Sequence, residues 1–349
     1  MGQFVLNFSS WLIKRMNSAS YKTLLLCYRD GYLIEKTLEI IKKYVNFDFK
    51  VDEIHLPRYL RHAFYSQKGG LLRSLVDMGI TDKLTVGEFI SHRMYVTEAS
   101  LKERAFALFK KCGYTSFTEP VVDYHRLLPV ISALDEIYSI STEEYTQTIK
   151  QYITDKVSGG NVAIFDIGYR ASITRFCAEF MGVQIPEFQM FSNSGFNYVT
   201  CNAPVETYIS YPTEIARSCS ILEILFENIL SSMEPELVGI GFDNDSNKFY
   251  YKFGSYPPGN NLIDQVQQGV LHYVEYSMGI LKEKLLDLKS DSFFEWSIIV
   301  DYLLKPELSS AEIISKLYRP DSSQIKGSSQ DNPFGGWYYA NLSRNKNER

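Results

Sequence analysis

Two short runs of apolar residues constrain the fold of this chain more than any other feature of its sequence. They lie within Lys22–Tyr28 (KTLLLCY) and Asn161–Phe165 (NVAIF), and polar residues flank both. Runs of this length without polar alternation are typical of strands that are buried on both faces, as in a parallel sheet covered by helices. Shorter candidates at 50–56, 187–191 and 206–211 extend the same predicted sheet.

Helical patterns alternate with these predicted strands, which indicates an α/β fold. Residues 33–44 carry apolar side chains at helical spacing between the first two strands, so the beginning of the chain predicts a βαβ unit. We expect a parallel-sheet core from residues 1–66 and 158–235, a helical insertion at 67–157, a C-terminal hairpin and helices at 236–319, and a flexible tail at 320–349.

Charge and cysteine content exclude several classes of protein. The chain has 349 residues and a formal net charge of −5, which argues against a general nucleic-acid binder because no basic excess is available to neutralise phosphates. Its 5 cysteines are widely spaced and form no CxxC motif, so neither a disulfide framework nor a zinc site is predicted. No apolar run approaches the roughly 20 residues that span a bilayer, and we expect a cytoplasmic protein.

The first candidate site is the turn that follows the first strand, Tyr28-Arg29-Asp30-Gly31. Glycine at a strand-to-helix turn allows a ligand to approach the backbone, and the first amides of the helix attract anions. The guanidinium of Arg29 would add a two-point contact to a phosphate. The alternative is an ordinary surface turn in which Asp30 caps the following helix.

The second candidate site is the segment from Asp166 to Thr174, which we expect to be a loop between a buried strand and a helix. Ligands of open parallel sheets bind at the carboxyl ends of the strands. There the carboxylate of Asp166 would bind ribose hydroxyls or a magnesium ion, while the loop amides, Ser172 and Thr174 would bind a phosphate. A haloacid-dehalogenase-type phosphatase needs a second acid two residues after the first, where Gly168 stands.

Together, the sequences RDGYLIEK and DIGYRASIT resemble the phosphoribosyltransferase-like modules that add ribofuranose to bacterial polysaccharides. Val162–Thr174 also resembles the phosphoribosyl-diphosphate loop of type I phosphoribosyltransferases. The resemblance covers about residues 20–66 and 158–232. The chain departs from the family pattern at two positions, because Ile167 stands where a second acid is usual and Ser172 stands where the residue is often glycine.

This resemblance implies that the chain transfers 5-phosphoribose from phosphoribosyl diphosphate (PRPP) to a sugar hydroxyl of a bacterial surface polysaccharide such as O-antigen or capsule, with release of pyrophosphate. The implied partners are PRPP, a lipid-linked or oligosaccharide acceptor, and a separate phosphatase that acts on the product. Contact with the inner face of the cytoplasmic membrane would be at most peripheral. The implied cofactor is Mg²⁺, held by the diphosphate and by Asp166 rather than by a metal site of the protein alone.

The same resemblance assigns roles to individual residues. Asp30, as the base that accepts the proton of the acceptor hydroxyl, and Asp166 would be catalytic. Donor binding would involve Arg29, Gly31, Arg58, Gly168, Tyr169, Arg170, Ala171, Ser172 and Thr174. Glu223 and Glu227 would contact the ribose or the acceptor, and they are candidates to replace the acid missing at Ile167.

Two other functions stay open from the sequence. One is a phosphatase or phosphotransferase that uses Asp166 as its nucleophile. The other is a non-catalytic module that binds a partner glycosyltransferase, and the missing acid at Ile167 favours it.

Overall fold

The structure is a computed structural model, and it describes most of the chain. The described residues are 1–56, 70–72, 75, 84–169, 172–193, 204–211, 225–235, 237–254, 261–288, 297–298, 301 and 312. Of the predicted regions, the tail at 320–349 and almost all of residues 289–319 of the C-terminal region lie outside the described residues. Among the described residues, no helix combines the length and apolar character needed to cross a membrane.

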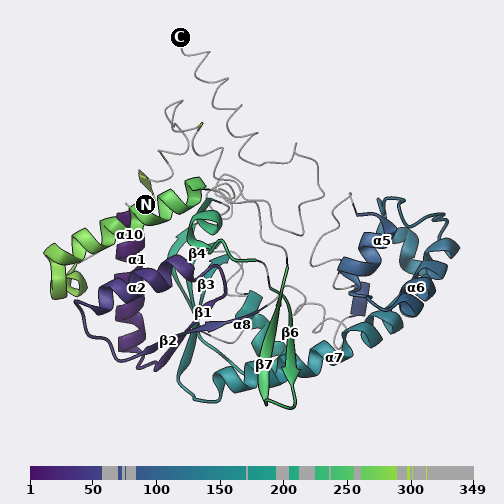
Figure 1. The fold of residues 1–349 in the computed structure, drawn as a ribbon, viewed down its shortest axis with the longest axis horizontal. Coiled ribbons are helices and arrows are strands. Elements are labelled where there is room, and N and C mark those ends of the chain that lie inside the picture. The colour runs from purple at the N-terminus through teal and green to yellow at the C-terminus, as the bar shows by residue number, and fades with distance from the viewer. Residues whose placement is uncertain are drawn as a thin grey trace, which may run out of the picture. The chain divides into compact units, whose positions relative to one another are not determined.

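A five-stranded parallel sheet forms the centre of the fold, which confirms the predicted α/β class (Figure 1). Its strand order is β2-β1-β3-β4-β5, and each neighbouring pair is parallel. The strands are β1 (Thr23–Cys27), β2 (Lys50–Ile54), β3 (Val162–Tyr169), β4 (Glu187–Asn193) and β5 (Val205–Tyr211). The chain leaves β1 toward β2 on one side and leaves β3 toward β4 on the other. The strand order therefore reverses between β1 and β3, where open parallel sheets bind their ligands.

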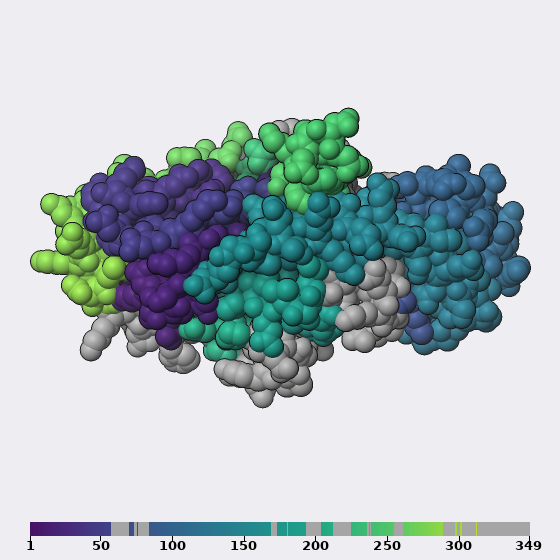
Figure 2. All heavy atoms as spheres, turned by 90° about the horizontal axis from the view of Figure 1, so that it is seen from below, coloured from purple at the N-terminus to yellow at the C-terminus, as the bar shows by residue number. Residues whose placement is uncertain are grey.

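Three helices, α1 (Gly2–Ser18), α2 (Tyr32–Lys42) and α10 (Asn261–Leu281), pack against one another beside this sheet (Figure 1). Figure 2 shows the purple N-terminal residues in contact with the yellow-green residues of the α10 region, although the two segments are far apart in sequence. A short 3-10 helix, η5 (Lys282–Asp287), follows α10, and the buried hydroxyl of Ser10 donates to the carbonyl of Leu285. Helix α1 at the beginning of the chain and the α10–η5 segment thus contribute to one core.

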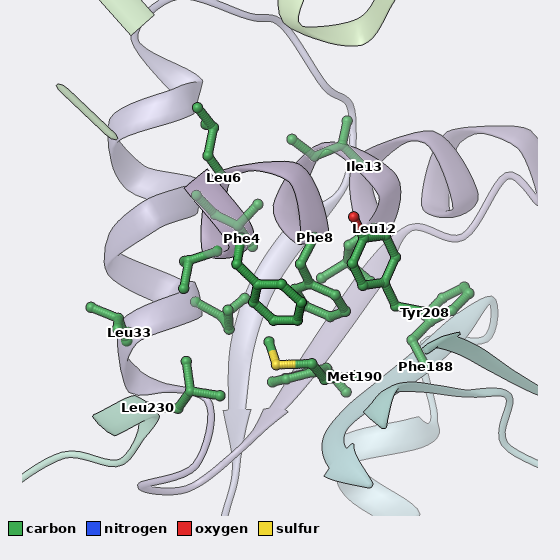
Figure 3. Packing of buried hydrophobic residues seen from close by; sticks show 14 of the residues in the cluster. Phe4, Leu6, Phe8, Leu12, Ile13, Leu33, Phe188, Met190, Tyr208 and Leu230 are labelled. Atoms are coloured by element: carbon green, nitrogen blue, oxygen red, sulfur yellow. The ribbon is translucent and has the colours of Figure 1, made fainter. Parts of the chain in front are cut away.

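Aromatic side chains of α1 pack against the strands in that core (Figure 3). The ring of Phe4 stacks on Phe191 of β4 with centroids 5.8 Å apart, and Phe8 lies 5.3 Å from Phe165 of β3. Figure 3 also shows Met190 and Tyr208 of the sheet facing the same helix. Aromatic pairs at these separations stabilise a core beyond the area they bury.

A second compact unit contains residues 56–158 and 237–253. Its helices are α5 (Val86–Glu88), η1 (Phe89–Arg93), α6 (Ala99–Lys111), η2 (Tyr124–Val130) and α7 (Ile131–Val157). They enclose an apolar core that is separate from the core of the first unit.

The antiparallel hairpin of β6 (Leu237–Asp243) and β7 (Lys248–Phe253) belongs to this second unit. The sequence analysis grouped the hairpin with the C-terminal helices instead. The difference has a physical reason, since the buried ring of Tyr152 on α7 lies edge-on to Phe249, with centroids 5.2 Å apart. Residues from 254 onward return to the first unit.

Close contact between β3 and β4 depends on Gly168. This glycine has a φ of +127°, and a Cβ at its position would overlap the carbonyl oxygen of Phe191 in the neighbouring strand. Any other residue would have to adopt a strained backbone and push β4 away.

We predict that Gly168→Ala lowers the free energy of unfolding by about 3 kcal/mol, because backbone strain and overpacking act together. Chemical denaturation monitored by circular dichroism measures this change. Gly269→Ala is the matched control, since Gly269 is exposed on α10 and has open space around its Cβ position. The control should change stability by about 1 kcal/mol or less. Equal effects of the two substitutions would contradict the close approach of the strands.

Candidate functional site

The turn between β1 and α2 has an unusual backbone. Arg29 has a φ of +67°, which is uncommon for a residue with a side chain. Its carbonyl oxygen accepts from the amide of Tyr32 at 3.1 Å and from the amide of Ser232 at 3.0 Å. The second bond comes from a segment about 200 residues further along the chain, so a tertiary contact holds the turn.

Asp30 is the half-buried acid of this turn. The hydroxyl of Ser231 donates to its Oδ1 at 2.8 Å. Helix α2 begins after Gly31 and has no side-chain cap, so Asp30 does not have the helix-capping role that the sequence left open. The carboxyl group is instead held at the carboxyl edge of the sheet, next to β3.

Gly31 is required for packing, and this corrects the reason that the sequence suggested for it. A Cβ at this position would lie 2.6 Å from the Cβ of Leu26 in β1. The backbone approaches the strand beneath it, whereas the sequence analysis expected the glycine to make room for a ligand. Replacement by alanine therefore tests the packing of α2 on β1 and not donor binding.

Tyr28, the first residue of the turn, contacts both β2 and the segment at Pro235. Its amide donates to the carbonyl of Ile54 at 2.9 Å, and its hydroxyl donates to the carbonyl of Pro235 at 3.1 Å. The ring stacks on that of His55, which directly follows β2, with centroids 4.6 Å apart. The Nε2 of His55 lies 3.7 Å from the carboxylate of Glu53.

Asp166 lies inside β3, not in a loop. The sequence predicted that the strand ends at Phe165 and that a loop continues to Thr174. In the structure, β3 extends to Tyr169, with Asp166 beside Gln189 and Gly168 beside Phe191 in β4. The strand continues because the backbone of Gly168 can lie against β4 and because Ile167 is buried.

Helix α8 (Ser172–Phe176) begins only three residues after the end of β3, and a π-helical turn, η3 (Cys177–Met181), follows it. The predicted donor-binding residues Tyr169 and Ser172 therefore mark the end of the strand and the beginning of the helix. Four other predicted site residues lie outside the described part of the chain: Arg58, Arg170, Ala171 and Glu223.

Thr174 is fully buried, and both its hydroxyl and its amide form hydrogen bonds to other groups of the protein. Its hydroxyl donates to the carbonyl of Ile185 at 3.3 Å, and its amide donates to Oε2 of Glu187 at 3.1 Å. The carboxylate of Glu187 thus accepts the hydrogen bond of an amide in the first turn of α8, and the sequence analysis had expected this amide to bind a phosphate. The other oxygen of Glu187 accepts from the side-chain amide of Gln189.

Three carboxyl groups act on a fourth, that of Asp166. Burial raises the pKa of Asp166 well above its usual value, and the nearby charges of Glu187, Asp30 and Glu227 raise it further. Glu227 is exposed on the helical residues 225–230. Burial also raises the pKa of Glu187, although its hydrogen bonds with Thr174 and Gln189 oppose the change. Since like charges at close range cannot all ionise freely, Asp166 favours its neutral form.

Two buried thiols lie near the acids. Burial raises the pKa of Cys27 well above its usual value, and Asp166, Asp30 and Glu187 add to the effect. Burial, followed by the charge of Glu187, raises the pKa of Cys177 to about 12. Both thiols therefore stay protonated and unreactive at neutral pH.

Sequence reasoning found Asp30, Asp166 and Glu227, which the structure brings together, but missed Ser231, Glu187 and Gln189. The last two had a signal, because they are polar residues in a strand that is otherwise buried (EFQMF). Ser231 had none, since its contact with Asp30 joins residues that are distant in sequence.

Among the described residues, no group of three or more histidine, cysteine or acidic side chains is arranged to hold a metal ion. A magnesium ion bound with a diphosphate does not need such a group. It typically takes one or two carboxylates, substrate oxygens and water. Asp30 could supply such a carboxylate, whereas Asp166, which favours its neutral form, would first have to lose its proton.

Comparison with known proteins identifies no relative. No protein-family model matches the chain, and a search of curated proteins likewise finds no match.

We predict that Asp166→Asn stabilises the protein at neutral pH. A carboxyl group whose pKa is raised by folding binds its proton more tightly in the native state. The wild type therefore loses stability as pH rises from about 4, where the carboxyl of an unfolded chain titrates, toward the native pKa. An asparagine does not titrate, so the difference in melting temperature should grow as pH rises above about 4.

The control for this experiment is Asp48→Asn. Asp48 is exposed and precedes β2, at the opposite edge of the sheet from the acids. If the advantage of Asp166→Asn over this control stays constant across the pH range, the assigned environment of Asp166 is incorrect.

Proposed function

We propose that this chain transfers a 5-phosphoribosyl group from PRPP to a sugar hydroxyl of a bacterial surface polysaccharide and releases pyrophosphate. One observation supports this proposal most. Asp30 follows β1 and Asp166 lies in β3, where the strand order of the parallel sheet reverses, and Asp30 is near enough for its charge to raise the pKa of Asp166. The geometry supports a group-transfer site with two acids in different environments. The identity of the donor and of the acceptor rests on the sequence resemblance alone.

The two acids would have different roles because their surroundings differ. Asp30 accepts a hydrogen bond from Ser231, which favours a charged carboxylate that can act as a base. Asp166 lies among other acids, which favours its neutral form. A neutral carboxyl can donate a hydrogen bond to a ribose oxygen, whereas a base must be ionised.

In the proposed reaction, the acceptor hydroxyl oxygen forms a bond to C1 of the ribose as the bond from C1 to the diphosphate oxygen breaks. The leaving pyrophosphate takes the bonding electron pair, and Asp30 takes the hydroxyl proton. The ribose carries positive charge at C1 during this exchange, as sugars do in glycoside chemistry. Nearby carboxyl groups would favour such a charge electrostatically.

PRPP carries three phosphate groups, a diphosphate on C1 and one phosphate on C5, and so brings negative charge to a site that already holds several carboxyl groups. Magnesium bound with the diphosphate would neutralise part of that charge. Arg29 would contribute a positive charge from the turn itself. The buried side chain of Thr174 and the packed Gly31 are not part of this proposal, because neither has space for a ligand.

Glu227 would be on the acceptor side of the site. It is exposed and close enough to Asp166 to affect its pKa. An exposed carboxylate next to the reacting groups is suited to bind hydroxyls of an acceptor sugar.

The alternative function is a phosphatase or phosphotransferase with Asp166 as its nucleophile. One observation favours it, because Asp30 is close enough to supply the second acid that is missing at Gly168. The raised pKa of Asp166 argues against it, since a protonated carboxyl group is a poor nucleophile. Hydrolysis of p-nitrophenyl phosphate with loss in Asp166→Asn would support this alternative.

We predict different kinetic effects for the two acids. Asp30→Asn should lower turnover by about 10²–10⁴-fold while the affinity for PRPP changes little, as expected for loss of a general base. Asp166→Ala should abolish transfer without unfolding the protein, because alanine removes the hydrogen-bond donor that asparagine would keep. Calorimetry with PRPP and magnesium measures affinity, and ³¹P NMR of released pyrophosphate measures turnover.

Asp48→Asn again serves as the control, and it should have wild-type affinity and turnover. If neither acid variant differs from this control, Asp30 and Asp166 are not the reacting groups. If the wild-type chain neither binds PRPP nor releases pyrophosphate, the proposed donor is incorrect.

A further inference from the structure

The turn that carries Asp30 is held by a segment that lies about 200 residues away in sequence. Three hydrogen bonds join them. Ser231 donates to the carboxylate of Asp30 at 2.8 Å, the amide of Ser232 donates to the carbonyl of Arg29 at 3.0 Å, and the hydroxyl of Tyr28 donates to the carbonyl of Pro235 at 3.1 Å. Residues 231–235 thus contact three consecutive residues of the turn.

That segment is held in turn by one side chain of α10. The Nε2 atom of Gln267 donates to the carbonyl of Ile229 and to the carbonyl of Ser231, both at 2.8 Å. A primary amide has two N–H groups, and this geometry uses both of them. The two carbonyls lie at the end of the helical residues 225–230, where backbone acceptors lack partners within the helix.

The position of Gln267 is unusual for a glutamine. Its side chain is only 3% exposed, and it shares the buried face of α10 with Ile263, Val270 and Val274. A buried amide is costly unless its hydrogen bonds are satisfied, and an apolar residue would fill this position at lower cost. The two hydrogen bonds to the backbone carbonyls of Ile229 and Ser231 offset the cost of burying this amide.

We propose that Gln267 is a positioning residue for Asp30, acting through Ser231. The chain of contacts begins in the core on α10, passes through the backbone of Ser231 and ends with its hydroxyl on the carboxylate. It fixes where the carboxylate oxygen lies, and the unusual backbone of Arg29 depends on the same segment. The catalytic part of this inference rests on the proposed function, and the structural part does not.

Two variants test the contacts, and each has a matched control. Gln267→Met keeps the size of the side chain and removes both donors, and Gln268→Met makes the same change at the exposed neighbouring position. Ser231→Ala removes the hydroxyl on Asp30. Ser232→Ala removes the hydroxyl of the adjacent buried serine, which accepts from the amide of Glu234, and it keeps the backbone amide that binds Arg29.

The first measurement is hydrogen exchange of the full-length chain, which requires no substrate. In Gln267→Met, exchange should increase in peptides that cover residues 229–235 and 28–32, compared with Gln268→Met. An increase in both peptides supports the proposal. If Gln267→Met and Gln268→Met show the same exchange in these peptides, Gln267 does not hold the turn and the proposal is overturned.

The second measurement is steady-state transfer with PRPP and magnesium. Ser231→Ala and Gln267→Met should each lower kcat by about tenfold, the effect of one hydrogen bond to a charged group, while affinity for PRPP stays within about twofold. Wild-type kcat in both variants would overturn the catalytic part. If the wild-type chain has no transferase activity, the proposed function fails, and hydrogen exchange alone decides whether Gln267 positions the turn.

Discussion

Helices that cover the parallel sheet force its polar chemistry to one edge. α1 buries Phe4, Phe8 and Leu12 against the strands, and α2 and α10 pack on α1. Charged groups have no place in such an interior unless they are paired. Asp30 lies in the turn that follows β1, and Asp166 lies within β3 beside the end of β1, where the strand order reverses.

This concentration of acids opposes stability. Glu187, Asp30 and Glu227 act on Asp166, and burial disfavours the charged forms of Asp166 and Glu187. The protein offsets part of that cost with donors, since Thr174 and Gln189 bind Glu187 and Ser231 binds Asp30. Asp166 keeps an unfavourable environment, and residues that reduce stability in this way are concentrated at functional sites.

The sequence was sufficient to predict the strands and the edge of the sheet, because an uninterrupted apolar run such as TLLLC is too short for a core helix and too apolar for a surface segment. It was insufficient at β3, where Asp166 and Gly168 resemble the beginning of a loop. Whether a strand continues through a glycine depends on the backbone beside it, here that of Phe191. The hydrogen-bond partners of Asp30 and Thr174 could not be predicted either, because a local sequence pattern does not indicate which other segment of the chain a residue contacts.

The same dependence on distant contacts makes α10 important to a site that it does not form. Its apolar residues fix it against α1 and α2, and the buried amide of Gln267 then binds the backbone that holds Asp30. A carboxylate at the edge of a sheet would otherwise depend on a short turn that contains a residue with a positive φ. Under the proposed function, Asp30 would have to be held within fractions of an ångström, and a contact anchored in the core is suited to that precision.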